Sequence, residues 1–346
     1  MRGVIKKDHG EGHVELSEAP MPVIGVDEVL IKCKIAPIGS DVRVYKGDPV
    51  MSKAVQPPVI LGSENSGEIV EVGKNVKNWK IGDRVVSELI ASSCGQCELC
   101  KTGKAFRCNK VTVLGRGQNG TFADFFKVQS QFLHRIPENV SFENASMAED
   151  LGVCLSVLSE HRVVNLEDNV AILGPGPMGL LSLQVSKKCG AGKILVTGAE
   201  QDKKRLSMAQ EMGADHILEI GKESTEEAVD DITKGEGMDV VVLATGAAPA
   251  IAQALNIVKK YGTIVVIGFP QGSVTVPWQN VASKTPKILG AWGASGWQDW
   301  ERALRCISSE SINVAKLITH KFGLEDWKKA FDTFDSAEGV KVVLVP

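Results

Sequence analysis

The chain has 346 residues, 43% of them hydrophobic, and a formal charge of −3, with an isoelectric point near 6.1. This length and composition are sufficient for two domains with ordinary apolar cores. The charge provides no basic stripe for nucleic acid, no apolar run reaches membrane-spanning length, and no signal-peptide core follows the N-terminus, so we expect a cytoplasmic protein that binds small molecules.

The first part of the chain, from Met1 to about Pro137, consists of short β-like segments broken by Gly, Pro and Asp. Strands this short, with turns this frequent, are typical of a curled antiparallel sheet. The predicted strands are Val29–Ile35, Gly67–Val72, Arg84–Val86 and Phe122–Val128.

One polar loop in this part holds four cysteines with the spacing C-x-x-C-x-x-C-x7-C. Four thiolates complete the tetrahedral coordination of zinc and leave no open position, so the loop predicts one structural zinc per chain. An iron–sulfur cluster is the alternative. Scattered cysteines elsewhere in the chain indicate reduced thiols rather than disulfides. The predicted zinc ligands are Cys94, Cys97, Cys100 and Cys108.

The next part of the chain begins with a helix over residues 145–164 and then alternates strands with helices, which predicts a parallel sheet covered on both faces. Its predicted strands are Val170–Leu173, Lys193–Thr197, Val240–Leu243, Thr263–Ile267 and Lys287–Leu289.

The C-terminal part holds two predicted helices, at 297–308 and 324–334, and a strand over 341–345. We expect these elements to return to the first domain. The predicted domains are therefore residues 1–150 with 291–346, and residues 151–290.

The first strand of the second domain leads directly into a G-x-G-x-x-G motif and a helix. This arrangement lets backbone N–H groups and a helix N-terminus hold a pyrophosphate. The alternative is that the glycines only turn the chain. The motif residues predicted to bind the cofactor are Gly174, Gly176, Pro177, Met178 and Gly179.

The choice between NAD and NADP depends on the turn after the second strand. Glu200 stands about 20 residues past the glycines, where a carboxylate that binds ribose and repels a 2′-phosphate is expected. Gly198 leaves room for that phosphate, however, and Lys203, Lys204 and Arg205 provide charges to neutralise it, unless they form a solvated helix face. We expect NAD, with NADP as the alternative.

Several motifs occur in one order along the chain: G-S-E-x-x-G at 62–67, G-D-R-V at 82–85, the cysteine loop, the glycine motif, and the segments 239–246 and 262–269. Together they resemble the zinc-containing medium-chain dehydrogenase/reductase superfamily, especially its sorbitol and threonine dehydrogenase branch. The resemblance implies an α/β protein with a GroES-like β-rich catalytic domain and a Rossmann domain with a doubly wound parallel sheet. It also implies hydride transfer with a nicotinamide, and cofactor contacts at Thr245 and Gly268.

The resemblance further implies a homodimer or homotetramer, joined through edge strands of the Rossmann sheets. Val274–Val276 is the segment expected to form part of that edge.

The sequence departs from this family where zinc members carry two ligands of a catalytic zinc. Ile38 stands at the position of a cysteine and Ser63 at that of a histidine, while Arg43 replaces a second histidine. Because Ile38 has no lone pair and a neutral hydroxyl is a poor zinc ligand, we expect that the catalytic zinc is lost. The alternative is a harder divalent ion held by carboxylates, namely Asp41, Glu64, Glu149 and Asp150.

Without that zinc, another group must stabilise the developing negative charge. Arg43 is the predicted group because a guanidinium stays charged and offers forked donors; the alternative is that it pairs with Asp41 or Glu64 as scaffolding. Ser40 stands at the family's proton-relay position, with Tyr45 or Glu149 to complete the path. The predicted catalytic residues are Ser40, Arg43, Tyr45, Ser63, Glu64 and Glu149.

None of the six histidines replaces the missing ligands by its position, and we expect His134 to be a surface or core residue. The tryptophans Trp292, Trp297 and Trp300 follow the last Rossmann strand, where they line the substrate pocket, pack in the core or form a subunit contact.

The predicted function is NAD(P)-dependent hydride transfer at a hydroxyl or ketone of a polyol-, sugar- or hydroxy-acid-like substrate. One alternative is reduction of a conjugated carbon–carbon double bond. Zinc-free relatives with that activity usually lack the cysteine loop, so its presence favours the first activity. The other alternative is a nucleotide-binding redox sensor without turnover.

Overall fold

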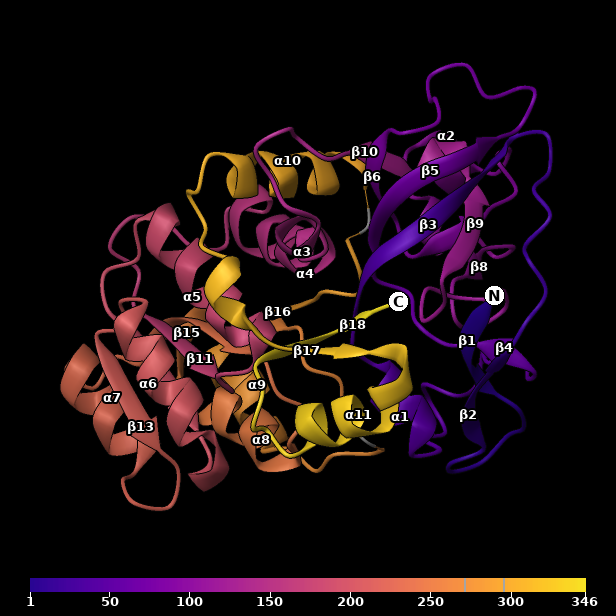
Figure 1. The fold of residues 1–346 in the computed structure, drawn as a ribbon. Coiled ribbons are helices and arrows are strands. Elements are labelled where there is room, and N and C mark those ends of the chain that lie inside the picture. The colour runs from indigo at the N-terminus through magenta and orange to yellow at the C-terminus, as the bar shows by residue number, and fades with distance from the viewer. Residues whose placement is uncertain (271, 295) are drawn as a thin grey trace. The chain divides into compact units, whose positions relative to one another are not determined.

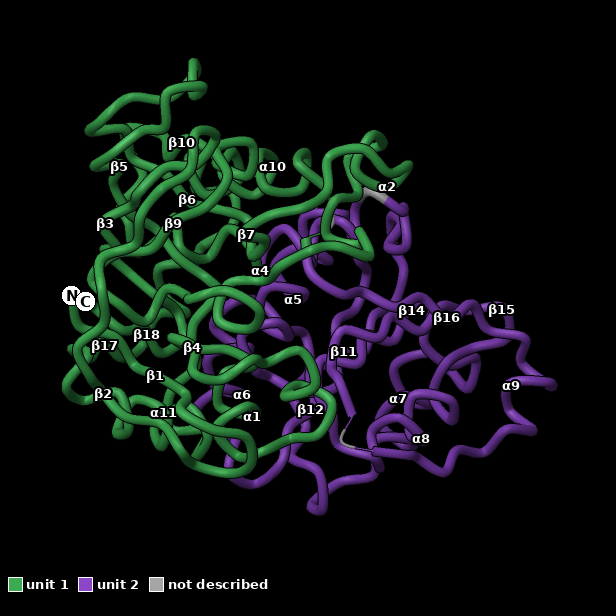
Figure 2. The backbone as a smooth tube through the Cα atoms, turned by 90° about the vertical axis from the view of Figure 1, so that its right-hand side faces the viewer, with its two compact units in different colours: residues 1–149, 294–346 green, residues 150–293 purple. Residues whose placement is uncertain are grey.

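The computed structural model describes residues 1–270, 272–294 and 296–346. The chain forms two compact units, which Figure 2 colours green and purple. Unit 1 comprises residues 1–149 and 294–346, and unit 2 comprises residues 150–293. Within the described ranges, no helix combines the length and apolar character needed to cross a membrane.

Unit 1 is built on a seven-stranded sheet with the order β10-β6-β5-β3-β18-β17, in which β9 also pairs with β3 (Figure 1). The pairs are antiparallel except for β17 and β18, which confirms the expected antiparallel sheet. Its strands are β3 (Glu28–Pro37), β5 (Ser66–Val72), β6 (Arg84–Ser87), β9 (Phe125–Gln129), β10 (Leu133–Arg135), β17 (Ile318–Gly323) and β18 (Lys341–Val345).

Two small sheets complete the β-structure of unit 1. One has the order β2-β1-β4, formed by Val14–Glu18, Arg2–Lys6 and Val59–Ile60, and the other pairs β7 (Ile90–Ser92) with β8 (Thr112–Val113). The strand predicted over 122–128 begins only at Phe125. The reason is that the backbone of Phe122 is hydrogen-bonded elsewhere: its carbonyl accepts from the N–H of Val4, and its N–H donates to the carbonyl of Leu61. The chain therefore lies against the smaller sheet before it enters the larger one.

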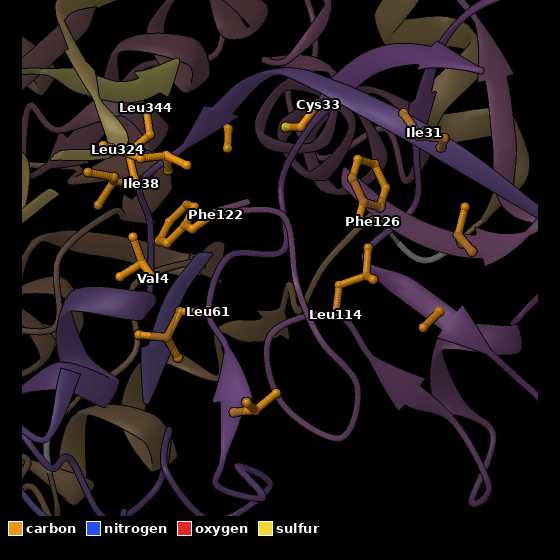
Figure 3. Packing of buried hydrophobic residues seen from close by; sticks show 14 of the residues in the cluster. Val4, Ile31, Cys33, Ile38, Leu61, Leu114, Phe122, Phe126, Leu324 and Leu344 are labelled. Carbon is orange, nitrogen blue, oxygen red and sulfur yellow. The ribbon is translucent and has the colours of Figure 1, made fainter. Parts of the chain in front are cut away.

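The core of unit 1 lies around β3, whose side chains are buried on both faces for most of its length. Figure 3 shows Ile31 and Cys33 from this strand, with Phe122 and Phe126 nearby, in one apolar cluster. Burying each large side chain stabilises the fold by about 1.5–3 kcal/mol. This core fixes the segment that follows β3, where the predicted catalytic residues begin.

The described residues after 294 add four helical stretches and the last two strands to unit 1. The helical stretches are α10 (Trp297–Ser308), the 3₁₀ turns Ala315–Leu317 and Leu324–Asp326, and α11 (Trp327–Asp335). Strand β18 then pairs antiparallel with β3, with Val343 opposite Pro37. The C-terminal strand therefore lies beside the start of the candidate site.

Unit 2 contains a six-stranded sheet with the order β13-β12-β11-β14-β15-β16, and every pair is parallel. This is the order of a doubly wound dinucleotide-binding sheet, which confirms the predicted Rossmann fold. Its strands are β11 (Val170–Leu173), β12 (Ile194–Gly198), β13 (His216–Glu219), β14 (Met238–Leu243), β15 (Val258–Val266) and β16 (Lys287–Gly290). Its longer helices are α5 (Pro177–Cys189), α6 (Lys203–Glu211), α7 (Thr225–Thr233) and α8 (Ala248–Ile257).

Three further sequence predictions differ from the structure. Strand β13 was not predicted because its four residues include only two apolar side chains. The helix predicted over 145–164 is divided into α3 (Phe142–Ala145), α4 (Ala148–Cys154) and a π-helical stretch, Leu155–Glu160. The hydroxyl of Ser146 donates to the carbonyl of Glu143 between α3 and α4, a local bond that competes with helix continuation.

The third difference concerns the edge of the Rossmann sheet. Residues 274–276 form no strand, and the edge beyond β15 is β16. Gly272, with φ +82, precedes the segment, and Pro277, which has no N–H to donate to a sheet, follows it. Val274–Val276 is therefore not an edge strand within the chain, and its expected part in a subunit contact stays a prediction.

Candidate functional site

The four cysteines of the polar loop gather around one point in unit 1. The Sγ atoms of Cys97 and Cys100 lie 3.5 Å apart, those of Cys94 and Cys108 3.5 Å, and those of Cys94 and Cys100 3.9 Å. A tetrahedral zinc with bonds of about 2.3 Å sets its sulfur ligands about 3.8 Å apart. A multi-iron core would hold them farther apart. The sulfurs therefore fit a single zinc ion.

Backbone groups of the loop already favour a thiolate. The N–H groups of Gln96 and Cys97 donate to Cys94 and lower the pKa of its thiol to about 6. The loop is held by α2 (Glu98–Lys101) and a 3₁₀ turn at Ala105–Arg107, and neither has a buried residue. Ala105 and Phe106 of the turn pack against the core of unit 1. The cysteine-bearing part of the loop is polar, so a bound metal would contribute to its stability.

The glycine motif of unit 2 connects β11 to α5, and each glycine has a distinct steric reason. Gly174 has φ +105, which strongly favours glycine. A Cβ on Gly179 would lie 1.9 Å from the carbonyl oxygen of Gly174, so helix and loop touch there. A Cβ on Gly176 would have no atom within 4 Å, which leaves open space before the helix. With Pro177 at the first helical position, this is the geometry of a pyrophosphate cradle.

Two further predicted cofactor residues lie beside this motif. A Cβ on Gly174 would lie 3.0 Å from Cβ of Thr245, and one on Gly268 would lie 2.2 Å from the carbonyl oxygen of Thr245. The loops that follow β11, β14 and β15 are thus packed together at the carboxyl ends of their strands. The sheet order reverses between β11 and β14, where such folds bind their nucleotide. Met178 lies in the first turn of α5, and its carbonyl accepts from the thiol of Cys154.

The turn after β12 contains more acidic groups than the sequence interpretation used. Glu200 is exposed and lies 3.5 Å from Lys203. Asp202 accepts from the N–H of Ala199 at 3.1 Å and from Arg205 at 3.1 Å. Burial lowers the pKa of Arg205. Two of the three cations expected to neutralise a 2′-phosphate, Lys203 and Arg205, are therefore already paired with carboxylates.

Gly198 does not open onto empty space. A Cβ at this position would lie 2.9 Å from Cγ of Pro175 and 3.0 Å from Cβ of Asp202. The absence of a side chain at Gly198 therefore allows the glycine loop to pack closely against the turn. The space on the Cβ side of Gly198 is filled by Pro175 and Asp202, so the expectation that this space is left for a phosphate is wrong.

In unit 1, the residues that replace the zinc ligands have two different surroundings. Ile38 is fully buried, and Figure 3 shows it grouped with Leu324 and Leu344. Its N–H donates to the carbonyl of Val342 on β18. Ser63 is also buried, in the loop between β4 and β5. The isoleucine therefore belongs to the apolar core, whereas the serine is a buried polar residue.

Glu64 has a buried cationic partner that the sequence analysis did not include. The Nζ atom of Lys341 lies 2.6 Å from Oε2 of Glu64, and the two side chains are 3% and 10% exposed. Strand pairing of β18 with β3 brings Lys341 to this position. The available signal was a single lysine at the start of an apolar strand, K-V-V-L-V.

Glu149 lies close to the same carboxylate, with ligand oxygens of Glu64 and Glu149 within 4.8 Å of one another. Oε1 of Glu149 also accepts from the N–H of Ala294 at 3.4 Å. Lys341 balances the charge of Glu64 but not that of Glu149, so the carboxylate site for a harder divalent ion stays an alternative.

Arg43 lies on α1 (Asp41–Tyr45) and pairs with Asp48, an acid that the sequence analysis did not name. Its Nη2 atom lies 2.6 Å and its Nε atom 3.0 Å from Oδ2 of Asp48. Burial acts to raise the pKa of Asp48, but N–H groups of Met51 and Val50 and the Arg43 guanidinium outweigh it and lower the pKa. Arg43 is thus anchored at one edge of its guanidinium, and its catalytic role stays a prediction.

Tyr45 packs its ring against two aromatic side chains of α11. The ring centroids of Trp327 and Phe331 lie 5.7 Å and 5.8 Å away in edge-to-face arrangements. Such contacts account for the tyrosine as part of the core of unit 1.

Ser40 and Asp41 contact an arginine that no motif indicated. Arg116 donates from Nη2 to Oγ of Ser40 at 3.0 Å and from Nη1 to Oδ1 of Asp41 at 3.1 Å. Ser40 is exposed, whereas Asp41 and Arg116 are buried. No local signal in the sequence identifies Arg116, because it lies 75 residues from Asp41.

His134 is a core histidine, as one of the two expectations stated. Its Nδ1 atom lies 2.8 Å from Glu301 and its Nε2 atom 3.5 Å from Glu88. The imidazole stacks on Trp300 and contacts Trp297, with centroids 5.5 Å and 5.6 Å away. In unit 2, Trp292 instead packs against Phe269. Two of the three tryptophans therefore fix α10 onto β10.

We expect the stability of unit 1 to depend on the protonation of His134. Burial acts to lower the pKa of this imidazole, but hydrogen bonds with Glu301 and Glu88 raise it above 6.5. A raised folded-state pKa gives a stabilisation that is complete below about pH 6.5 and is lost as pH rises through the folded-state value. The melting temperature of the wild type should therefore fall between pH 6 and 9 in part because His134 loses its proton. His134→Gln should remove that contribution to the fall. The exposed His9→Gln is the control, and parallel curves for the wild type and His134→Gln would contradict the expectation.

Comparison with known proteins gives matches along nearly the whole chain. Residues 25–138 match the alcohol dehydrogenase GroES-like domain, and residues 177–309 match the zinc-binding dehydrogenase family. The chain is 36% identical to a sorbitol dehydrogenase of Halalkalibacterium halodurans, over 100% of this chain and 99% of the relative. It is 34% identical to a D-arabitol-phosphate dehydrogenase of Enterococcus avium, with 99% and 97% covered.

Two other matches have different substrates or a bound cofactor. An L-threonine 3-dehydrogenase of Bacillus subtilis is 34% identical, with 100% of this chain and 99% of the relative covered. Among solved structures, an alcohol dehydrogenase from Escherichia coli CFT073 in complex with NADH has a TM-score of 0.87 and 26% identity, with 100% and 99% of the two chains covered.

Proposed function

The chain belongs to the zinc-containing medium-chain dehydrogenase/reductase superfamily and is an NAD(P)-dependent dehydrogenase, and we propose that it performs its reaction without a catalytic zinc. Its relatives act on polyols and other hydroxy compounds. We propose hydride exchange at a secondary hydroxyl or ketone of a polyol-like, sugar-like or hydroxy-acid-like substrate.

Two observations carry the metal-free proposal. Ile38 is buried in the apolar core, and the ammonium of Lys341 lies against Glu64. A side chain without a lone pair cannot ligate an ion, and a second cation beside the ammonium would be repelled by it. These two residues therefore disfavour zinc at the position that the family uses.

The chain's own side chains then have to manage the charge and the proton. The nicotinamide, when bound, accepts or supplies the hydride. We propose that Ser40 passes the hydroxyl proton of the substrate, and that the cationic groups of Arg43 and Lys341 stabilise negative charge on the substrate oxygen. Ser63 and Glu149 offer hydrogen bonds to the substrate hydroxyls.

We propose NAD as the preferred cofactor, because the turn after β12 carries the acidic side chains of Glu200 and Asp202. A carboxylate there accepts from ribose hydroxyls and repels a 2′-phosphate. We expect the dissociation constant of NADH to be at least about tenfold lower than that of NADPH, measured by fluorescence titration. Glu200→Ala should bring the dissociation constants of NADH and NADPH closer together. Glu211→Ala, at the exposed end of α6, should leave their ratio unchanged. Tighter binding of NADPH to the wild type would contradict the proposal.

The proposed activity is tested with a substrate panel followed at the absorbance of the reduced cofactor. The panel contains polyols, polyol phosphates, L-threonine and hydroxy acids with NAD⁺, and conjugated enones with NADH. Turnover of a hydroxy compound supports the proposal, and turnover of enones alone supports double-bond reduction. Cofactor binding without turnover of any compound supports the redox sensor.

The assembly and the structural zinc are also proposals. We propose one zinc on the four cysteines of each chain, and a homodimer or homotetramer, to be measured by light scattering. Strand β16 offers an edge for such pairing, since Ile288 on it is half-exposed.

A further inference from the structure

Arg116 makes contacts in unit 1 that the proposed catalytic residues do not explain. One guanidinium joins an exposed hydroxyl, Ser40, to a buried carboxylate, Asp41, at 3.0 and 3.1 Å. We propose that Arg116 is a positioning residue, which holds Ser40 in the orientation needed for proton transfer. This inference rests on the proposed function, in which Ser40 carries the proton.

The backbone around Arg116 is held in place on both sides. Its N–H donates to the carbonyl of Val113, and its carbonyl accepts from the N–H of Gln56. Gly115, with φ +73, packs against Gly62: a Cβ on Gly115 would lie 2.6 Å from the carbonyl oxygen of Gly62. Arg116 also donates from Nη1 to the carbonyl of Gly115. The guanidinium therefore projects from a fixed loop.

The carboxylate partner fixes the direction of the guanidinium. Asp41 is 1% exposed and also accepts from the N–H of Gly62 at 3.1 Å. A buried charge of this kind requires a partner, and removing the partner leaves the charge uncompensated. The charge of Asp41 is balanced by Arg116 from another loop. The planar fork of arginine can hold Asp41 and Ser40 with two separate nitrogens.

This contact determines which atoms of Ser40 take part in proton transfer. A guanidinium only donates hydrogen bonds, so Oγ of Ser40 uses one lone pair as an acceptor from Arg116. Its second lone pair and its own proton then point away from Arg116. During oxidation the substrate loses hydride to the nicotinamide and its hydroxyl proton to Oγ, and Ser40 releases its original proton to water. The serine returns to its neutral form and the carbonyl product is left.

The first test needs no turnover. In the Ser40→Cys variant, the alkylation rate of the introduced thiol is followed against pH by peptide mass spectrometry. Because a cation lies within hydrogen-bond distance, the pKa of this thiol should be at least about one unit below the ordinary value of about 8.5. Adding Arg116→Met together with Asp41→Asn, so that no buried charge is left uncompensated, should return the pKa to its ordinary value. An alkylation profile that this pair of substitutions leaves unchanged would overturn the proposal.

The second test is a double-mutant cycle with Ser40→Ala and Arg116→Lys, in which lysine retains a charge beside Asp41 and so preserves the fold. Arg116→Lys should lower kcat by about 30-fold with little change in KM, and should raise the solvent isotope effect on kcat. In the Ser40→Ala background the same substitution should have almost no effect. The proposal would be overturned if the fold-losses in kcat of the two single variants multiply in the double variant. It would also be overturned if Arg116→Lys has the kcat of the wild type. An inactive wild type would refute the proposed function alone, since the alkylation result does not depend on it.

Discussion

Alanine at position 179 should raise the dissociation constant of NADH by at least about 100-fold. The added Cβ would lie 1.9 Å from the carbonyl oxygen of Gly174, well inside any contact distance that real atoms adopt. The Cβ is fixed to the backbone of α5 and the carbonyl is itself backbone, so neither can move aside as a flexible side chain would. The loop from β11 must then shift away from α5, and the N–H groups that point at the pyrophosphate shift with it.

The same substitution three residues earlier is the matched comparison. Gly176→Ala introduces a Cβ with no protein atom within 4 Å, so the melting temperature of the unliganded protein should stay near that of the wild type. Its affinity for NADH should still fall, because the open space beside Gly176 is where a pyrophosphate would lie. Gly179→Ala should lower both affinity and melting temperature. Wild-type affinity in Gly179→Ala would show that the cofactor binds elsewhere.

Purified wild-type protein should contain one zinc per chain, and Cys100→Ser should remove it. The Cys100 sulfur lies 3.5 Å from that of Cys97 and 3.9 Å from that of Cys94, so its loss leaves three thiolates. Structural zinc contributes about 10–16 kcal/mol of apparent binding free energy in small domains, so the loop should lose its order. Metal content is measured by mass spectrometry and the order of the loop by its protease sensitivity.

The control is Cys306→Ser in the same unit, since this cysteine lies on α10 and outside the thiolate cluster. It should retain one zinc. The double variant Ile38→Cys with Ser63→His should raise the content toward two, because it restores two ligand types at the altered site. Two zinc ions in the wild type would contradict the proposed loss of the catalytic ion. A wild type without zinc would contradict the thiolate site.

The parts of the structure that sequence patterns predicted are those encoded by neighbouring residues. The glycine motif, the cysteine spacing and the apolar strands of the parallel sheet each lie within a short stretch, and the structure contains them at the expected positions. Strand β13 was missed since a four-residue strand with two apolar side chains gives no periodic signal.

The candidate catalytic region was harder to predict because its contacts join distant parts of the chain. Glu64 meets Lys341 only after β18 has paired with β3, and Asp41 meets Arg116 across a long loop. Neither pair has a spacing that a motif could reveal. Arg43 pairs with Asp48, only five residues away, whereas the acids expected as its partners were Asp41 and Glu64. Those two acids lie in the family motifs, and Asp48 does not.

Unit 1 is discontinuous in sequence, and this has a consequence for synthesis on the ribosome. Unit 2 is complete once residue 293 has emerged, whereas unit 1 still lacks β18. Until β18 is translated, the ammonium of Lys341 cannot pair with Glu64, and the end of β3 at Ala36 and Pro37 lacks its strand partner, although β9 already pairs with Glu28–Lys32. The nascent chain therefore passes through a stage with a finished nucleotide-binding half and an unfinished catalytic half, in which the unpaired end of β3 is open to mispairing.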